Sequence, residues 1–273
     1  MTTLTIAQSL AQARAMGVDR LDAQLILAHL LARPRSWLIA HDDAVLDAPQ
    51  AGAVRAAFTR RAAGEPLAYL LGEKEFHGLL LRVDANVLVP RPDTEVLVDW
   101  ALELLAGMAA APRVVDLGTG SGAIALAVKH GHPGATVLAT DISPAALGVA
   151  SANAQRLGLD VAFAQASWWT ALAGQRFDLA LSNPPYIAGG DPHLAALQHE
   201  PGLALTPGGD GLDALREIVS GAAPRLAPGA WLLLEHGYDQ ADAVHELLHA
   251  HGFKGIATRR DLGDRARCTG AHR

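Results

Sequence analysis

The stretch Val114-Val-Asp-Leu-Gly-Thr-Gly-Ser-Gly122 runs from a short apolar segment into a glycine-rich loop. The segment Arg113 to Leu117 predicts a buried strand, and the residues from Ala123 to Lys129 predict a helix directly after the loop. Glycines let the backbone turn tightly and come close to a ligand, and the first amides of a helix face whatever lies above its N-terminus. The stretch therefore predicts a ligand-binding loop between a strand and a helix.

Strands and helices continue to alternate after this loop. Alternation at this spacing predicts an α/β fold built on a doubly wound, mostly parallel sheet. Ligands of such sheets bind outside the carboxyl ends of the strands, which puts Gly118, Asp141, Ser167 and Asn183 on one rim. We expect strands at Thr136–Thr140, Val161–Gln165, Phe177–Ser182 and Ala230–Glu235, helices at Pro144–Leu157, Leu212–Leu226 and Asp239–His251, and one or two strands in the tail.

The residues before the loop divide into two regions. Residues 1–72 carry apolar side chains at helical spacing, interrupted at glycines and prolines, and predict a small all-helical N-terminal domain of four or five helices. Residues 73–89 are rich in β-favouring side chains and predict a β-hairpin linker. Pro92 then suits the first turn of a helix that runs on through Val96 to Leu105. We expect residues 90–273 to form the domain that carries the chemistry.

Composition excludes several classes of protein. The chain has 273 residues, of which 50% are hydrophobic and 18% are charged, so it is not intrinsically disordered. The formal net charge of −6 weighs against a nucleic-acid binder, which usually carries a basic excess. The single cysteine, Cys268, excludes a disulfide-rich scaffold and argues against a cysteine-based metal site, so we expect no metal. We find no basic leader and no long apolar run, and expect a cytoplasmic protein without a membrane segment.

Two adenosine ligands fit the glycine-rich loop. Gly118, Gly120 and Ala123 match the pattern of a dinucleotide-binding loop. Asp141 follows about 20 residues later, at the end of the next expected strand, where it can accept hydrogen bonds from ribose hydroxyls. The loop alone leaves both NAD and S-adenosyl-L-methionine open. Asp116 favours S-adenosyl-L-methionine, because a cationic sulfonium tolerates a nearby carboxylate and a pyrophosphate does not.

Two tryptophans follow the third expected strand, directly after Ser167. The indole of Trp168 or Trp169 can pack against an adenine ring. The same side chains can equally belong to the core or the rim of the sheet. The sequence leaves these two interpretations open.

The segment Ser182-Asn-Pro-Pro-Tyr186 follows the fourth expected strand. A planar amide or aryl amine is a poor nucleophile because its lone pair is delocalised, so an enzyme must hold its NH₂ group in place. The side-chain oxygen of Asn183 and the backbone carbonyl of Pro184 can accept the two N–H groups. Pro185 stiffens the loop, and Tyr186 can stack on the planar acceptor. The segment predicts methyl transfer by positioning, without a metal or a covalent nucleophile.

These segments together resemble the HemK/PrmC family, the glutamine methyltransferases of class I peptide chain release factors. The resemblance covers most of the chain and includes the helical first 70 residues, which look like the family's substrate-docking domain. It rests on Gly72-Glu-Lys-Glu-Phe76, Val89-Pro-Arg-Pro-Asp-Thr-Glu95, Asp116-Leu-Gly-Thr-Gly-Ser-Gly122, Ser182-Asn-Pro-Pro-Tyr186, Glu200-Pro201 with Ala204-Leu205, Gly209-Asp-Gly-Leu212, Leu234-Glu-His-Gly237 and Asp261-Leu-Gly-Asp264.

The resemblance implies a Rossmann-like class I methyltransferase fold and methylation of the glutamine amide nitrogen (N5) in the release factors' Gly-Gly-Gln motif, with S-adenosyl-L-homocysteine as the other product. We expect a monomer whose partner is the release factor and which does not contact nucleic acid directly. One departure concerns Ser167, since relatives often carry an acid at this place, although a serine can still accept a hydrogen bond. The resemblance implies cofactor contacts from Gly118, Thr119, Gly120, Ser121, Gly122, Asp141, Ser167, Trp168 and Asn183, and glutamine contacts from Asn183, Pro184, Pro185 and Tyr186.

Other activities compete with this interpretation. A glutamine methyltransferase of a ribosomal protein would use the same site and a different docking domain. An adenine-amino DNA methyltransferase would also use Asn-Pro-Pro-Tyr, but it should flip its base and carry a basic recognition domain. A protein that binds S-adenosyl-L-methionine without catalysis would not need Asn183 to Tyr186, and an NAD oxidoreductase would not explain them.

Overall fold

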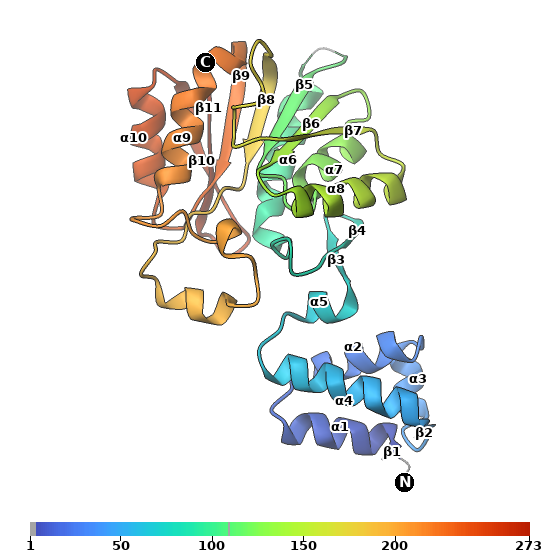
Figure 1. The fold of residues 1–273 in the computed structure, drawn as a ribbon. Helices are drawn as coiled ribbons and strands as arrows, with labels where there is room; N and C mark the ends of the chain where they lie inside the picture. Colours follow the sequence, from blue (N-terminus) through green and yellow to red (C-terminus); the bar gives the residue numbers. More distant parts are fainter. Residues whose placement is uncertain (1–3, 109) are drawn as a thin grey trace. The chain divides into compact units, whose positions relative to one another are not determined.

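The computed structural model describes residues 4–108 and 110–273. The chain divides into two compact units, the first ending at Glu73 and the second running from Lys74 to Arg273 (Figure 1). Each unit has hydrophobic clusters of its own. No helix in the described part of the chain is long and apolar enough to cross a membrane.

The first unit is a bundle of short helices. Thr5, Asp19 and Asp47 cap three of them, because each side chain accepts a hydrogen bond from a backbone amide of the first turn. The core contains Ile6, Ile26, Leu27, Leu38 and Phe58, each at most 1% exposed. The helices are α1 (Ile6–Ala15), α2 (Arg20–Leu30), α3 (Arg35–Ala40), α4 (Ala48–Ala62) and α5 (Leu67–Leu71), and the two-residue strands β1 (Leu4–Thr5) and β2 (Val45–Leu46) pair antiparallel.

The second unit is built on a seven-stranded sheet with the order β10-β11-β9-β8-β5-β6-β7. All neighbouring pairs among β5, β6, β7, β8 and β9 are parallel. Strand β11 pairs antiparallel with both β9 and β10. The doubly wound, mostly parallel fold expected from the sequence is therefore confirmed. The strands are β5 (Arg113–Leu117), β6 (Thr136–Asp141), β7 (Val161–Gln165), β8 (Phe177–Ser182), β9 (Leu226–Glu235), β10 (Lys254–Arg260) and β11 (Ala266–His272).

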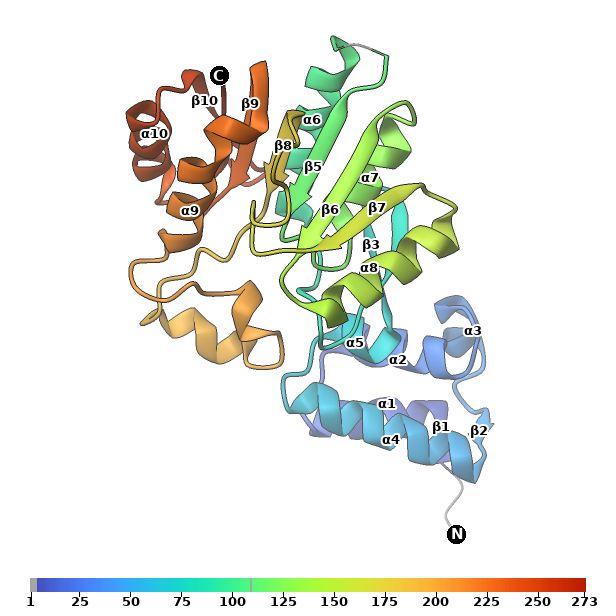
Figure 2. The ribbon, with the colours of Figure 1, turned by 45° about the horizontal axis from the view of Figure 1, so that its top comes forward.

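Helices cover both faces of the sheet. On β5, Val114 belongs to one hydrophobic cluster and Val115 to another, because successive side chains of a strand point to opposite faces. The first cluster includes residues of α6 (Glu95–Ala106) and α7 (Ala123–Gly131), and the second includes residues of α9 (Asp213–Ala222) and α10 (Ala241–Ala250). Helix α8 (Pro144–Leu157) lies beside β7, as Figures 1 and 2 both show.

A short hairpin precedes the large sheet. It consists of β3 (Glu73–Phe76) and β4 (Leu79–Arg82). Phe76 and Leu81 are buried in the same cluster as α6 and α7, and Asn153 of α8 exchanges two hydrogen bonds with the backbone of Arg82, at 2.7 and 3.0 Å. Residues 74–89 are thus packed into the second unit.

The boundary between α9 and β9 differs from the expected one. The helix expected over Leu212–Leu226 ends at Ala222, a 3-10 turn follows at Ala223–Arg225, and Leu226 already begins β9. Pro224 ends the helix because it lacks an amide hydrogen and its ring collides with the preceding turn. The tail forms two strands, within the range that the sequence allowed.

Candidate active site

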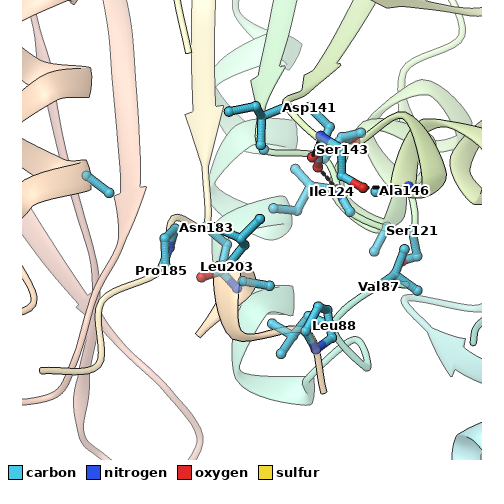
Figure 3. A pocket seen from close by; sticks show the side chains of 18 of the residues that line it. Val87, Leu88, Ser121, Ile124, Asp141, Ser143, Ala146, Asn183, Pro185 and Leu203 are labelled. Atoms are coloured by element: carbon cyan, nitrogen blue, oxygen red, sulfur yellow. Dashed lines mark hydrogen bonds between the residues drawn. The ribbon is translucent and has the colours of Figure 1, made fainter. Parts of the chain in front are cut away.

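A cavity of about 430 Å³ opens at the carboxyl ends of the parallel strands (Figure 3). Its wall contains the glycine-rich loop after β5, Asp141 at the end of β6, Ser167 and Trp168 after β7, and Asn183 after β8. The volume is in the usual range for a small-molecule site. The four residues that the sequence analysis placed on one rim, Gly118, Asp141, Ser167 and Asn183, therefore line the same cavity.

The glycine-rich loop approaches the cavity with its backbone. Gly118, Gly120 and Gly122 have φ values of +74°, +57° and +85°, a region that side chains with a Cβ rarely adopt. Gly118, Thr119, Gly120 and Ser121 line the cavity. Gly122 is at the N-cap of α7 instead, where a Cβ would lie 3.0 Å from Leu126 Cδ1, so its role is close packing of the helix.

Asp141 holds this loop in place. Its Oδ2 accepts a hydrogen bond from the amide of Gly120 at 2.9 Å, and its Oδ1 accepts one from the amide of Ser143 at 2.9 Å. The side chain also lines the cavity. A carboxylate has about four acceptor positions, so Asp141 can hold the loop and still accept hydrogen bonds from a ligand's hydroxyl groups.

Asp116 is buried behind the loop. The hydroxyl of Thr119 donates to its Oδ2 at 2.6 Å, and the amide of Ala125 donates to the same atom at 3.2 Å. Its Oδ1 has no hydrogen-bond partner in the part of the chain that the structure describes. Burial raises the pKa of Asp116 to about 7. A positive charge in the cavity would favour the ionised form of this carboxyl group.

The two tryptophans after β7 have different surroundings. Trp168 lines the cavity, and its ring lies against Gly118. Trp169 is 6% exposed, and its Nε1 donates to the carbonyl of Ile218 at 2.9 Å. Ser167 also lines the cavity. The adenine-packing interpretation thus fits Trp168, and the core interpretation fits Trp169.

The acceptor segment places Asn183 and Pro185 in the cavity wall, and Figure 3 shows both just beyond the end of their strand. Pro184 is buried and is not part of the wall. Tyr186 lies outside the wall as well, and its hydroxyl donates to Glu235 Oε1 at 3.3 Å. The stacking of Tyr186 on an acceptor stays a prediction, and the structure shows this ring packed in the cluster of α9 and α10.

The Asn183 side chain has a fixed partner. Its Nδ2 donates to the hydroxyl oxygen of Thr94 at 3.1 Å. Thr94 ends the 3-10 turn Pro92–Thr94 and is 4% exposed. With Nδ2 engaged, Oδ1 is the atom of this amide that remains to accept hydrogen bonds from a substrate.

The mouth of the cavity is formed by two further segments. Glu200 accepts a hydrogen bond from the amide of Val89 at 3.0 Å and forms a salt bridge with Arg91. This carboxylate joins the segment before α6 to the loop that carries Leu203, which lines the cavity and is 76% exposed. In the view of Figure 3, Leu88 and Leu203 lie below Asp141.

The comparisons with known proteins agree over most of the chain. Residues 4–72 match the PrmC N-terminal domain, and residues 94–211 match the methyltransferase small domain. The release factor glutamine methyltransferase of Bordetella pertussis is 51% identical over 259 residues, which cover 94% of this chain and 96% of the relative. The chain belongs to the release factor glutamine methyltransferase family. The Escherichia coli K12 member of the family is 39% identical over 267 residues, with 97% of this chain and 96% of that protein covered.

A solved structure supports the fold independently. A methyltransferase from Pyrococcus furiosus is 17% identical and superimposes with a TM-score of 0.54, covering 71% of this chain and 89% of that one. At this identity the likeness concerns the fold alone. The expected family, enzyme class and cofactor are confirmed: the protein is a methyltransferase that uses S-adenosyl-L-methionine.

The residues of the cavity suit this cofactor. Asp116 is buried behind the loop, and its Oδ1 has no partner among the described residues, so the group can place a negative charge there. Such a charge attracts the cationic sulfonium and ammonium groups of S-adenosyl-L-methionine and would repel a pyrophosphate. Asp141 offers free acceptor positions for ribose hydroxyls, and the Trp168 ring offers a flat apolar face. Gly118 and Gly120 line the cavity without a side chain, so the backbone there can come close to a ligand.

Several cavity residues escaped the sequence analysis. Thr94 lies inside the quoted motif Val89-Pro-Arg-Pro-Asp-Thr-Glu95, in which only Pro92 had an expected role, at a helix start. Val87 and Leu88 line the cavity although their segment predicted a linker, and Leu203 and Glu217 come from segments without any chemical signal. Leu203 lies between Glu200-Pro201 and Ala204-Leu205, which carry part of the family resemblance, so this resemblance was the one signal for its loop.

Proposed function

We propose that the protein methylates the side-chain amide nitrogen of the glutamine in the Gly-Gly-Gln motif of class I peptide chain release factors. The names of the relatives support the substrate. The observation in this chain that carries the chemistry is the bond from Asn183 Nδ2 to Thr94, because it leaves Asn183 Oδ1 to accept from an NH₂ group. A carboxamide is the planar acceptor that such a site suits.

Positioning is the main task of the site. Asn183 Oδ1 accepts one N–H group of the glutamine amide, and we assign the other to the carbonyl of Pro184, a buried residue outside the cavity wall that directly follows Asn183. Two acceptors on one loop would fix the plane of the amide nitrogen. Pro184 and Pro185 restrict the loop, so little reorganisation is needed when the amide binds. Gln240 Nε2 donates to the Tyr186 carbonyl at 2.9 Å and fixes the far end of the same loop.

The cofactor side of the cavity completes the arrangement. When bound, S-adenosyl-L-methionine supplies an electrophilic methyl group on a good leaving group. We assign its binding to Asp141, Ser167, Trp168 and Asn183, together with the loop from Gly118 to Gly122, in which Gly122 acts by packing α7. Asp116 adds a buried carboxyl group behind the loop.

The remaining roles follow from this assignment. We propose that residues 1–72 dock the release factor, that 73–89 connect the two parts, and that 90–273 bind the cofactor and carry out the transfer. We further propose a monomer that acts in the cytoplasm, where its translation-factor substrate works, and that does not bind nucleic acid directly. The net charge of −6 supports the last point.

A labelled-methyl transfer assay tests the function. The protein and S-adenosyl-L-methionine are offered unmethylated release factor, ribosomal protein and DNA in separate reactions. We expect label on the Gly-Gly-Gln glutamine alone, and an Asn183→Ala variant to transfer about 100-fold more slowly. Label on ribosomal protein or DNA instead would retain the site and overturn the substrate. The relatives' names do not favour either of these alternatives.

A further inference from the structure

Tyr186, the last residue of the acceptor segment, is held by one turn of the chain. Its hydroxyl donates to Glu235 Oε1 at 3.3 Å, and its backbone carbonyl accepts from Gln240 Nε2 at 2.9 Å. Glu235 ends β9, and Gln240 is the N-cap residue of α10. We call residues 235–240 the β9–α10 turn. This turn contacts Tyr186 twice, once at the tip of its side chain and once at its backbone.

The Gln240 side-chain amide can satisfy its partners in only one orientation. Its Oε1 accepts from the backbone amide of Gly237 at 2.9 Å, and its Nε2 donates to the Tyr186 carbonyl. A backbone amide can only donate and a backbone carbonyl can only accept, so the two partners require different ends of this side chain. Gln240 thus links the backbone of the β9–α10 turn to the backbone of the acceptor segment in a fixed geometry.

Gly211 closes off the space around the same carbonyl. A Cβ at this position would lie 2.4 Å from the Tyr186 oxygen and 3.0 Å from Gln240 Nε2. Gly211 has a φ of +83°, a region that favours glycine. It lies in Gly209-Asp-Gly-Leu212, a motif to which the proposed function gives no role. The close approach of this backbone and the hydrogen bond from Gln240 together enclose the Tyr186 carbonyl.

The side chain of Tyr186 is held as firmly as its backbone. Its ring packs against the hydrophobic cluster that includes residues of α9 and α10. Burial and the nearby Glu235 raise the pKa of the Tyr186 hydroxyl, so the hydroxyl keeps the proton that it donates. Arg267 Nη1 donates to the same oxygen at 3.5 Å. The ring cannot turn toward a substrate in the cavity without losing the contacts with Glu235 and Arg267.

We propose that the β9–α10 turn anchors the acceptor segment, and that Gln240 is a positioning residue for the methyl transfer. Tyr186 is then the anchored residue and not a surface on which the substrate stacks. The inference rests on the proposed function, in which Asn183 and the Pro184 carbonyl receive the glutamine amide. Each proline has a fixed φ, so few torsions separate the Tyr186 carbonyl from these two acceptors, and a displacement of one displaces the others. An error of about 1 Å in such a position can slow a reaction about 100-fold.

Gln240→Glu removes the donor and changes little else. The variant keeps one oxygen for the Gly237 amide and turns a second oxygen toward the Tyr186 carbonyl, so these two oxygens repel each other. We expect kcat on release factor to fall about 10- to 100-fold, while calorimetric affinity for S-adenosyl-L-methionine changes less than about threefold. The retained affinity also shows that the variant is folded. An unchanged kcat, or an affinity that falls as much as kcat does, would overturn the proposal.

Two further variants separate the lost hydrogen bond from the added charge. Gln240→Met has a similar length and no charge, so it should lower kcat as Gln240→Glu does. Full activity of Gln240→Met would contradict a role for the bond. Gln155→Glu is the matched control, because it makes the same change in charge at an exposed position of α8. It should keep the wild-type kcat, and a fall as large as that of Gln240→Glu would assign the effect to charge instead.

Tyr186→Phe distinguishes an anchor from a stacking surface. Phenylalanine keeps the aromatic ring and removes the hydroxyl that donates to Glu235. Stacking predicts the wild-type kcat for this variant. Anchoring predicts a fall of about 3- to 10-fold, smaller than for Gln240→Glu because the bond to the backbone carbonyl remains. A wild-type kcat would refute the assignment of Tyr186, and if the variant does not fold, the Gln240 variants decide the question.

A measurement without turnover separates this proposal from the proposed function. The amide of Ile187 follows the Tyr186 carbonyl in the same peptide unit and donates to the carbonyl of Leu205 at 3.0 Å. Its hydrogen exchange should be slow in the wild type and at least about tenfold faster in Gln240→Glu. Equal exchange rates would refute the anchor, whatever the substrate is. Faster exchange in the variant, with no methylation of release factor by the wild type, would refute the substrate and keep the anchor.

Discussion

The ring of Trp168 occupies the space beside Gly118 where a side chain would stand. A Cβ built on Gly118 would lie 3.2 Å from Cζ3 of the indole. Gly118 has a φ of +74°, and Trp168 itself has a φ of +45°, which is rare for a large side chain. The ends of β5 and β7 thus meet through two residues in unusual backbone conformations, and both residues line the cavity.

We predict that Gly118→Ala weakens the binding of S-adenosyl-L-methionine by about tenfold. The added methyl group displaces the ring and strains a left-handed backbone, at a cost of about 1–2 kcal/mol. Isothermal titration calorimetry measures the effect. Gly148→Ala is the matched control, because Gly148 is in α8, has nothing within 4 Å of its Cβ position and should bind as the wild type does. Equal affinities of the two variants would contradict the tight contact.

Asp141 provides the second prediction, because it serves both the loop and the cavity. Asp141→Ala removes the acceptor for the Gly120 and Ser143 amides as well as the acceptor for ribose hydroxyls. We expect affinity for S-adenosyl-L-methionine to fall about 10- to 100-fold, as for the loss of hydrogen bonds to a charged group. Asp141→Asn keeps one acceptor oxygen, so its affinity for S-adenosyl-L-methionine should lie between those of the wild type and Asp141→Ala. Unchanged calorimetric affinity in Asp141→Ala would exclude the ribose role.

Asp116 gives a prediction about pH. Since burial raises its pKa to about 7, the group gains its charge between about pH 6 and pH 8. A cationic ligand stabilises the charged form, so affinity for S-adenosyl-L-methionine should rise over this range, and binding near pH 7 should release protons. Titrations in buffers of different ionisation enthalpy measure the protons released. Asp116→Asn, which keeps the acceptor for Thr119 and Ala125, should show neither effect.

The same pKa shift affects stability without ligand. The folded-state pKa of Asp116 lies above its ordinary value of 3.8, so the stabilisation from this group is complete below pH 3.8 and is lost as the pH rises through about 7. The free energy of unfolding, measured in urea, should therefore fall more between pH 5 and pH 8 in the wild type than in Asp116→Asn. Parallel slopes in the two proteins would show that Asp116 titrates normally.

The sequence predicted the positions of the site best where parallel strands end. Gly118, Asp141 and Asn183 each follow a strand with a clear apolar pattern, and parallel strands bring their carboxyl ends to one edge. The sequence did not predict where α9 ends, because the apolar pattern of the helix continues past Pro224 to Leu226, although Pro224 ends it. Local patterns thus located the rim, and their largest error was the boundary between α9 and β9.

Contacts between distant segments were beyond the sequence. Trp168 and Trp169 are neighbours, yet only Trp169 is a core residue. The indole of Trp169 fits into the core because Gly221 has no side chain. A Cβ at Gly221 would lie 2.4 Å from Trp169 Cδ1. The bond between Thr94 and Asn183 likewise joins residues 89 positions apart. Such pairings depend on how elements pack, and a single sequence carries no direct signal for them.

The last prediction concerns the helical unit. The hydrophobic cluster of this unit contains only residues from Ile6 to Phe58 among its buried members, whereas the clusters of the second unit begin at Phe76. A chain that begins at Glu73 keeps β3 whole and loses none of those second-unit residues. We therefore expect it to fold and to bind S-adenosyl-L-methionine within about threefold of the wild type.

The truncated chain should methylate intact release factor at least about 100-fold more slowly, because it lacks the proposed docking surface. A short peptide with the Gly-Gly-Gln sequence is the control substrate, since it is too small to use that surface. Both proteins should methylate the peptide at the same low rate, which would place the loss in docking rather than in chemistry. Full activity of the truncated chain on release factor would refute the docking role, and a loss of peptide methylation as well would show that the helical unit supports the catalytic site itself.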